Sequence, residues 1–291
     1  MKRVGLYVNL GKPDALKRVE HAAKHLRSLG AECCVEPEVK ARITPAVAKY
    51  LEPVPLNEYD KFADVVISFG GDGTMLRCAR TLLHSDIPIM GVNLGKLGFL
   101  AEFSVDDVDR ALDDMMSGNY RVVDRAALCT HIETEDGEET VYALNEFVIE
   151  KYGSSRMITV QAFVEEHHVA NYRADGLILT TPTGSTAYSL SCGGPIIAPS
   201  SQVLCITPIS PHALTLRPLI VPDTNDVSFI LGGASDEAAL VADGQQIAVL
   251  RAGGRITIRK SEYNVKLLKR ADSTYFDLLR AKLLWSAGGI Q

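Results

Sequence analysis

A glycine-rich turn follows a short apolar run near position 70. Residues 65–69 have the composition of a buried strand. Gly70-Gly71-Asp72-Gly73-Thr74 comes next, and helix-compatible residues resume at Met75. Glycines let a backbone approach a ligand closely, and the free N–H groups of such a turn and of the first helical residues favour an anion. The pattern therefore predicts a phosphate site.

Asp72 makes this prediction more specific. A carboxylate beside a phosphate repels it, unless the carboxylate accepts a proton or holds Mg²⁺. The same five residues also fit a plain turn with Thr74 as a helix N-cap, which is the structural alternative.

Composition limits the class of protein. The 291 residues allow one large domain or two ordinary ones, and 46% hydrophobic with 23% charged residues is typical of a globular chain. A net charge of -6 argues against a general nucleic-acid binder. The first apolar run is too short for a signal peptide, and no stretch reaches the ~18 to 20 apolar residues of a membrane span. The cysteines lack zinc-site spacing, so we expect reduced, mostly buried thiols in a cytoplasmic protein without membrane contact.

The first 120 residues alternate apolar runs with amphipathic stretches. Strands are expected at 1–8, 33–36, 65–69 and 87–92, and helices at 16–29 before Gly30, from Thr74 to Leu83, and at 105–118 with Ser104 as its cap. This alternation predicts a parallel sheet covered on both faces.

Beyond about Tyr120 the sequence changes to short β-like runs separated by turns. These runs lie at 121–134, 140–150, 156–165, 169–173, 177–181, 227–231, 238–242, 255–260 and 265–269. They predict a mainly antiparallel, sandwich-like domain. Residues 275–285 return to a helical pattern, with Phe276, Leu279, Leu283 and Leu284 on one face available to pack on the first domain.

Several polar residues of the β domain could contact a nucleotide. Asn145-Glu146 lies inside an otherwise strand-forming run, where it is either a solvated face or a pair that recognises ribose hydroxyls or an adenine amino group. The hydroxyl-rich segment 180–195 can hold phosphate oxygens, with Tyr188 against a base, or can be a plain loop and cap.

The remaining candidates each have a plainer interpretation. Asp175 and Asp243 both precede glycine and fit turn aspartates. Arg156 and Arg173 either neutralise a pyrophosphate or are surface arginines.

Taken together, these segments resemble the NAD kinase family over roughly residues 3 to 285. The matching motifs, in the family's order, are Gly70–Thr74, Gly91–Leu100, Asn145-Glu146, Asp175-Gly176, Thr181–Pro195, Ile206–His212 with Leu216–Pro218, and Asp243–Gln245. The first glycine motif is shared with diacylglycerol, sphingosine and phosphofructokinase-like kinases, whereas Thr181–Pro195 singles out NAD kinase.

The resemblance implies that the chain transfers the γ-phosphoryl of ATP to the 2′-hydroxyl of the adenosine ribose of NAD, with a divalent metal such as Mg²⁺. It makes Asp72 the catalytic base and places the ATP phosphates at Gly70, Gly71, Gly73 and Thr74, with the metal ligands unknown. The implied NAD contacts are Asp72, Gly73, Asn145, Glu146, Arg156, Arg173, Asp175, Thr186, Ala187, Tyr188, Ser189, Leu190, Ser191 and Gln245.

The family's fold agrees with the pattern of elements. It implies an α/β N-terminal domain with a Rossmann-like parallel sheet (1–120), a mainly antiparallel β-sandwich-like domain that binds NAD (121–270), and a C-terminal helix (271–291) packing back on the first domain, usually in a homodimer or tetramer. One rival is a lipid or sugar kinase with the same glycine turn. Another is a non-catalytic NADP-sensing module, which needs no proton acceptor.

Overall fold

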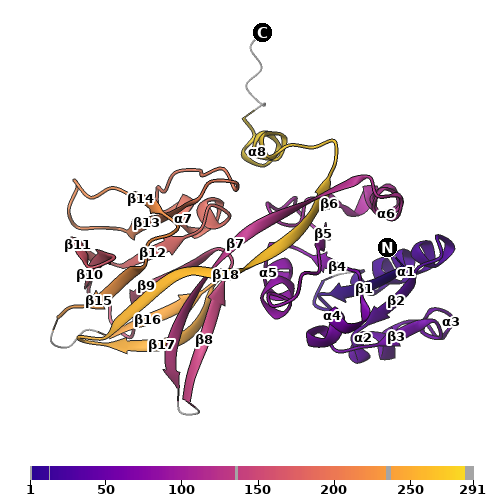
Figure 1. The fold of residues 1–291 in the computed structure, drawn as a ribbon, viewed down its shortest axis with the longest axis horizontal. Coiled ribbons are helices and arrows are strands. Elements are labelled where there is room, and N and C mark those ends of the chain that lie inside the picture. Colours follow the sequence, from indigo (N-terminus) through magenta and orange to yellow (C-terminus); the bar gives the residue numbers. More distant parts are fainter. Residues whose placement is uncertain (1, 13, 135–136, 234–236, 286–291) are drawn as a thin grey trace, which may run out of the picture. The chain divides into compact units, whose positions relative to one another are not determined.

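The computed structural model describes residues 2–12, 14–134, 137–233 and 237–285. The chain forms two compact units, one made of residues 1–124 with 265–291 and the other of residues 125–264. Figure 1 shows the ribbon with its elements labelled. Strands β7 (Tyr120–Thr134) and β18 (Arg255–Arg270) each contribute residues to both units.

The first unit contains the expected parallel sheet. Its strands are β1 (Arg3–Val8), β2 (Glu32–Val35), β3 (Leu51–Pro53), β4 (Val65–Gly70) and β5 (Ile89–Asn93), in the spatial order β3-β2-β1-β4-β5. Every neighbouring pair is parallel. The short β6 (Phe103–Ser104) and the C-terminal end of β18 also pair with β5 in parallel. In chain order, the strands after β1 are therefore added first on one side of it, as β2 and β3, and then on its other side, as β4 and β5.

The helices of the first unit are capped by residues at their ends. The longer ones are α1 (Ala15–Ser28), α5 (Asp72–Thr81) and α6 (Val108–Ser117), and shorter turns form α2 (Pro37–Arg42), α3 (Pro45–Ala48), α4 (Tyr59–Phe62), η1 (Leu56–Glu58) and η2 (Val105–Asp107). Gly30 and Gly118 take positive φ after α1 and α6, as predicted. The Ser104 hydroxyl accepts a hydrogen bond from Asp106 N at 3.2 Å and so caps η2, whereas the N-cap of α6 is Asp107, so the helix predicted over 105–118 is divided into η2 and α6. The N-cap of α5 is Gly71 and not Thr74, which corrects the structural alternative.

The second unit is a β sandwich. One antiparallel sheet has the order β14 (Leu219–Pro222), β13 (Val203–Ile209), β12 (Gly176–Thr180), β9 (Glu146–Lys151), β16 (Glu237–Ala242) and β17 (Gln245–Arg251). Opposite it lie β11 (His167–Ala174), β10 (Ile158–Val164), β15 (Val227–Leu231) and the N-terminal part of β18, to which the β7–β8 hairpin (β8, Gly137–Ala143) is added. Buried side chains from both sheets, among them Phe147, Leu179 and Phe229, form one hydrophobic core. The predicted antiparallel sandwich is confirmed.

Two sequence expectations about strands are wrong in detail. The runs at 255–260 and 265–269 are one strand, β18. The run 140–150 is broken, since β8 ends at Ala143 and β9 begins at Glu146. The cause of that break lies in the binding site described below.

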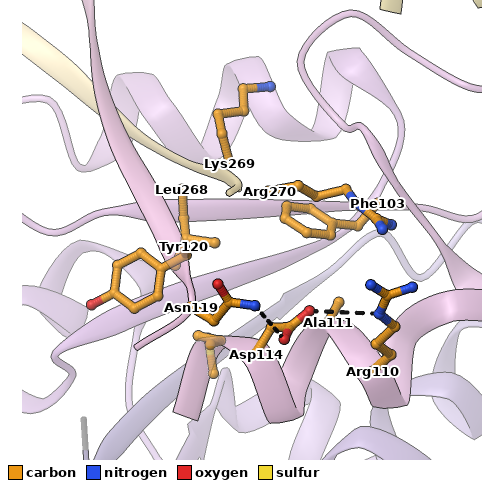
Figure 2. A pocket seen from close by; sticks show the side chains of 10 residues that line it. Phe103, Arg110, Ala111, Asp114, Asn119, Tyr120, Leu268, Lys269 and Arg270 are labelled. Atoms are coloured by element: carbon orange, nitrogen blue, oxygen red, sulfur yellow. Dashed lines mark hydrogen bonds and ion pairs between the residues drawn. The ribbon is translucent and has the colours of Figure 1, made fainter. Parts of the chain in front are cut away.

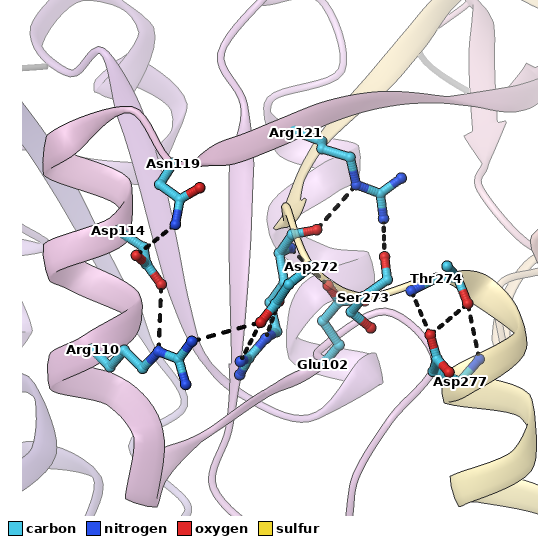
Figure 3. A network of polar contacts seen from close by, with 10 residues as sticks. Glu102, Arg110, Asp114, Asn119, Arg121, Asp272, Ser273, Thr274 and Asp277 are labelled. Carbon is cyan, nitrogen blue, oxygen red and sulfur yellow. Dashed lines mark hydrogen bonds and ion pairs between the residues drawn. The ribbon is translucent and has the colours of Figure 1, made fainter.

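The C-terminal segment belongs to the first unit, as the sequence predicts. Helix α8 (Tyr275–Leu283) starts with a capping box between Thr274 and Asp277, and Arg121 donates hydrogen bonds to the carbonyls of Arg270 and Ser273 just before it (Figure 3). The expected apolar face is only partly buried, because Leu279 is 4% exposed but Phe276 is 62% exposed. Among the described residues, no helix has both the length and the apolar character that crossing a membrane requires.

Candidate active site

The glycine turn joins β4 to α5 and leaves bare backbone on its open side. An added Cβ at Gly70 would lie 2.2 Å from Thr74 Oγ1, so Gly70 is required for the close packing of the turn. At Gly71 and Gly73, by contrast, an added Cβ would meet no described heavy atom within 4 Å. The Thr74 hydroxyl already accepts hydrogen bonds from Asn9 Nδ2 at 3.3 Å and from Gly71 N at 3.5 Å. Gly71 and Gly73 are thus the part of the turn that a ligand can approach, at the N-terminal end of α5.

Asp72, in the first turn of α5, is held by the backbone of a later loop. Its Oδ1 accepts hydrogen bonds from Leu100 N at 3.1 Å and Ala101 N at 3.0 Å, and its Oδ2 accepts one from Phe99 N at 2.8 Å. A carboxylate oxygen has two lone-pair positions. Oδ1 is therefore filled, and Oδ2 keeps one position for another donor.

Gly98 makes this arrangement possible. A Cβ on Gly98 would lie 2.0 Å from Asp72 Oδ1. The loop can wrap the carboxylate only because position 98 has no side chain.

A buried ion pair between Lys269 and Glu102 also holds the loop that contacts Asp72. Lys269 Nζ donates to Glu102 Oε2 at 2.9 Å and to the Leu100 carbonyl at 3.2 Å, and Glu102 Oε1 accepts from Arg270 N at 3.2 Å. In Figure 2 the Lys269 side chain points away from a small cavity beside α6, which at about 10 Å³ has room for no more than a water. Lys269 thus supports the loop that holds Asp72.

We predict that Lys269→Met strongly destabilises the protein. The Lys269 side chain is 6% exposed and that of Glu102 is 12% exposed, so the substitution leaves a carboxylate buried without its cation. Breaking such a pair costs about 3 to 5 kcal/mol. Urea unfolding measures the change. The matched control is Lys266→Met, whose partner Asp86 is 93% exposed and whose loss should change stability by less than about 1 kcal/mol. Equal effects of the two substitutions would contradict the role given to Lys269.

A larger pocket adjoins the glycine turn in the first unit. It encloses about 370 Å³ at the carboxyl ends of the strands, between the chain after β1, the chain after β2 and the start of α5. We call it the β1–α5 pocket; its lining residues are Tyr7, Val8, Asn9, Leu10, Gly11, Glu36, Glu38, Gly73, Thr74 and Arg77. Sequence reasoning did not single out Glu36, Glu38 or Arg77.

In the second unit, Asp243 explains why the strand breaks at Asn145-Glu146. Its carboxylate accepts hydrogen bonds from Leu144 N at 2.9 Å, Asn145 N at 2.8 Å and Glu146 N at 3.2 Å. These N–H groups turn toward Asp243 and not toward a neighbouring strand, so β8 and β9 are separated by a sharp bend. Asp243 itself has a φ of 46°. It is a turn residue, as the plainer interpretation held, and it also shapes the bend that presents Asn145 and Glu146.

Glu146 is a buried acid that lacks a partner for one oxygen. The residue is 5% exposed, and none of the described residues hydrogen-bonds its Oε2. Burial raises the pKa of Glu146 to about 8, and the nearby charge of Asp243 adds to the increase. A ligand that donates a hydrogen bond to Oε2 would satisfy this atom.

We predict that Glu146 makes folding stability depend on pH. The folded protein binds this proton more tightly than the unfolded chain, so Glu146 stabilises the fold at low pH. That contribution is lost as pH rises from the ordinary pKa near 4.5 through about 8. The free energy of unfolding of Glu146→Gln minus that of wild type should therefore increase by a few kcal/mol as pH rises through this window. Above about pH 8 the difference should stay constant. Urea unfolding from pH 5 to 9 measures the difference, and a pH-independent difference would contradict the prediction.

Much of the hydroxyl-rich segment is anchored within the protein. Thr180 Oγ1 donates to the Asn145 carbonyl at 3.0 Å, and Thr181 Oγ1 donates to the Leu144 carbonyl at 2.7 Å. An added Cβ on Gly184 would lie 2.3 Å from the Asn145 carbonyl oxygen. Ser189 is fully buried, and its hydroxyl lies 2.8 Å from that of Thr207. Ser189 therefore lacks the exposed surface that a direct ligand contact needs, which argues against its expected role.

Other members of that segment remain accessible. Thr186 ends η3 (Gly184–Thr186), and Tyr188 begins α7 (Tyr188–Ser191). Tyr188 is 40% exposed; burial raises its pKa, and negative charge including that of Asp175 acts in the same direction. Thr186, Ala187 and Leu190 are half-buried and Ser191 is exposed. These residues offer a surface to a ligand near Asp175.

Asp175 lies at the other end of the same strand pair from Glu146. Strands β9 and β12 pair with Glu146 opposite Thr180 and Glu150 opposite Gly176, the residue after Asp175. Asp175 accepts a hydrogen bond from Lys151 Nζ at 2.7 Å, a contact that the sequence did not indicate. Arg156, Arg173 and Gln245 are exposed. The structure thus brings Asn145, Glu146, Asp175 and Tyr188 into one unit, around the sheet that carries β9 and β12.

Comparison with known proteins decides the family. Residues 4–120 match the model of the ATP-NAD kinase N-terminal domain, and residues 144–270 match that of the ATP-NAD kinase C-terminal domain. The chain belongs to the NAD kinase family. The resemblance inferred from its motifs is confirmed.

Individual NAD kinases match over nearly their whole length. The NAD kinase of Bacteroides fragilis is 38% identical over 281 residues, covering 95% of this chain and 97% of that protein. That of Magnetococcus marinus is 39% identical over 289 residues, covering 98% of this chain and 94% of that protein.

Solved structures show the same fold. Yeast NADH kinase, complexed with NADH, has a TM-score of 0.88 at 24% identity, covering 100% of this chain and 89% of that one. An NAD kinase from Archaeoglobus fulgidus, in complex with ATP, has a TM-score of 0.74 at 28% identity, covering 96% of this chain and 99% of that one.

Proposed function

We propose that this chain is an NAD kinase that transfers the γ-phosphoryl group of ATP to the 2′-hydroxyl of the adenosine ribose of NAD, producing NADP and ADP. Membership of the family supports this activity. The structural observation that carries the mechanism is the Asp72 carboxylate, held by three backbone N–H groups beside the open glycine turn.

Asp72 is the proposed general base, and Oδ2 is the oxygen that accepts the proton. A ribose hydroxyl is a poor nucleophile at neutral pH, and a positioned base helps typically by about 10² to 10⁴-fold. As the new P–O bond forms, the hydroxyl proton passes to Oδ2. The bond between the γ-phosphorus and the oxygen that bridges it to the β-phosphate breaks, and ADP leaves.

The glycine turn is the proposed phosphate site. Gly71 and Gly73 expose backbone at the N-terminal end of α5, where a negative charge is favoured. Gly70 and Thr74 pack against one another, so their contribution is to shape the turn. Phosphoryl transfer depends mainly on such positioning and charge stabilisation.

A magnesium ion fits this scheme as part of the donor. Within the described residues, no group of three or more His, Cys, Asp or Glu side chains is placed to hold a metal. Mg²⁺ in kinases commonly takes one or two carboxylates together with substrate phosphates and waters. When bound, it supplies positive charge to the transferred phosphoryl group.

The NAD site is proposed in the second unit. Glu146 and Asn145 would contact the adenosine through hydrogen bonds, with Tyr188 against the base, and Asp175 would bind another hydroxyl or amide of the dinucleotide. Thr186, Ala187, Leu190 and Ser191 would line the site, and Arg156, Arg173 and Gln245 would complete it. A cytoplasmic location remains a prediction from the sequence composition, and assembly into a dimer or tetramer remains a prediction from the resemblance.

The test is NADP formation by the purified chain with NAD, ATP and Mg²⁺. Diacylglycerol and fructose 6-phosphate serve as control acceptors, because related kinases share the glycine motif. We expect NADP only. Phosphorylation of a control acceptor would contradict NAD as the acceptor, and nucleotide binding without turnover would favour a sensing module.

A further inference from the structure

The β1–α5 pocket lies at the reversal point of the parallel sheet. The chain leaves β1 toward β2 and leaves β4 toward β5, so the connections from the carboxyl ends of these two neighbouring strands diverge at this position. Open α/β sheets bind ligands in the crevice formed there. The pocket is lined on one side by Gly73 and Thr74 of the glycine turn. A ligand with phosphates at that turn can therefore extend into the pocket.

Glu36 gives the pocket a hydrogen-bond acceptor. It directly follows β2 and is half-buried, and no residue in the described ranges donates a hydrogen bond to its carboxylate or forms an ion pair with it. Burial raises the pKa of Glu36, and the positive charge of Arg77 acts in the opposite direction. Glu38 differs, since it is exposed and lies 3.3 Å from Arg42. Glu36 is thus the carboxylate of this pocket that is free to receive a ligand.

A ribose is the ligand group that suits this position. Its two hydroxyls can donate hydrogen bonds, and an ionised carboxylate can accept hydrogen bonds but cannot donate them. In dinucleotide-binding sheets an acidic residue about 20 residues beyond the phosphate-binding glycines takes a ribose hydroxyl. Glu36 is likewise an acidic residue at the carboxyl end of the second strand, although the glycine turn of this chain follows β4 and comes later in the sequence.

Arg77 provides the complementary charge. It lies four residues after Gly73 in α5, so the two share one face of the helix. Its guanidinium is near enough to act on the pKa of Glu36. A cation in the same pocket offsets the repulsion between an anionic phosphate and Glu36.

We propose that the β1–α5 pocket binds the ribonucleoside end of the phosphoryl donor, with Glu36 accepting hydrogen bonds from the ribose hydroxyls and Arg77 contacting a phosphate. This inference rests on the proposed function and extends it to the class of donor. It makes a ribonucleoside triphosphate a better donor than inorganic polyphosphate.

The test compares three ligands on the full chain by calorimetry with Mg²⁺: ATP, 2′,3′-dideoxy-ATP and inorganic tripolyphosphate. Wild type should bind ATP roughly tenfold more tightly than dideoxy-ATP, the effect expected for a hydrogen bond to a charged group. Glu36→Met should abolish that difference and leave tripolyphosphate binding unchanged or stronger. Glu38→Met, which removes an equal charge from the same pocket, should keep the difference. Arg77→Met should weaken all three ligands by a similar factor.

The outcome is decisive in either direction. The inference is overturned if Glu36→Met changes the affinities for ATP and dideoxy-ATP by the same factor, or changes neither. NADP formation by the same wild-type preparation separates this result from failure of the proposed function. If NADP forms but Glu36 does not discriminate, only the ribose assignment fails. If Glu36 discriminates but no NADP forms, the pocket is still a ribonucleotide site and the proposed reaction fails.

Discussion

Replacing Asp72 by Asn should lower kcat for NADP formation by about 10² to 10⁴-fold while NAD still binds. Asn cannot take the hydroxyl proton, since its amide nitrogen is not basic. The substitution also places an NH₂ group against one of the three backbone N–H donors that hold the carboxylate, so the loop loses at least one hydrogen bond. Steady-state kinetics with NAD and ATP varied separately measure the effect.

Asp243→Asn is the matched control, because Asp243 also accepts three backbone N–H hydrogen bonds. It shapes the bend at Asn145-Glu146 and not the glycine turn. We therefore expect Asp243→Asn to raise KM for NAD and Asp72→Asn to lower kcat. A near-normal kcat for Asp72→Asn would contradict the assignment of Asp72 as the general base.

Gly98→Ala should lower kcat by about 100-fold without unfolding the protein. The added methyl group would lie 2.0 Å from Asp72 Oδ1, so either the carboxylate or the loop must move. A displacement of about 1 Å of a catalytic group can reduce the rate about 10²-fold. The measurement is kcat, together with thermal unfolding to show that the fold persists.

The control for Gly98→Ala lies in the same loop. At Gly95 an added Cβ would be 3.8 Å from Asn93 Oδ1, an ordinary contact. Gly95→Ala should therefore retain near-wild-type kcat. If both alanine variants were equally active, the steric argument about Asp72 would be wrong.

Local sequence patterns predicted the parts of the fold that local interactions determine. The strand before Gly70, the glycine after α1 and the Ser104 cap each depend on neighbouring residues, and each was found where expected. Strand β13 was missed because Pro208 lies within it, and proline argues against a strand flanked on both sides. Strand β17 was missed because it is exposed or half-buried along its length and shows no apolar alternation.

The supports of the active site could not be read from the sequence. The hydrogen bond from Leu100 to Asp72 spans 28 positions, and the Lys269–Glu102 pair spans 167. The sequence identified Asp72 as an unusual carboxylate. It gave no indication of which backbone groups hold it, because those groups lie 27 to 29 positions away in the chain.

The hydrogen bonds around Asp243 also bear on the order in which the chain acquires its binding surface. They join Asp243 to residues 97 to 99 positions earlier in the chain. Closing a segment of that length has an entropy cost roughly 1 kcal/mol larger than closing the 28-position loop at Asp72. The bend that presents Glu146 therefore forms only when β16 has paired with β9. A nascent or truncated chain that ends before β16 would carry the whole Asn145-Glu146 motif and still lack the surface to which NAD is proposed to bind.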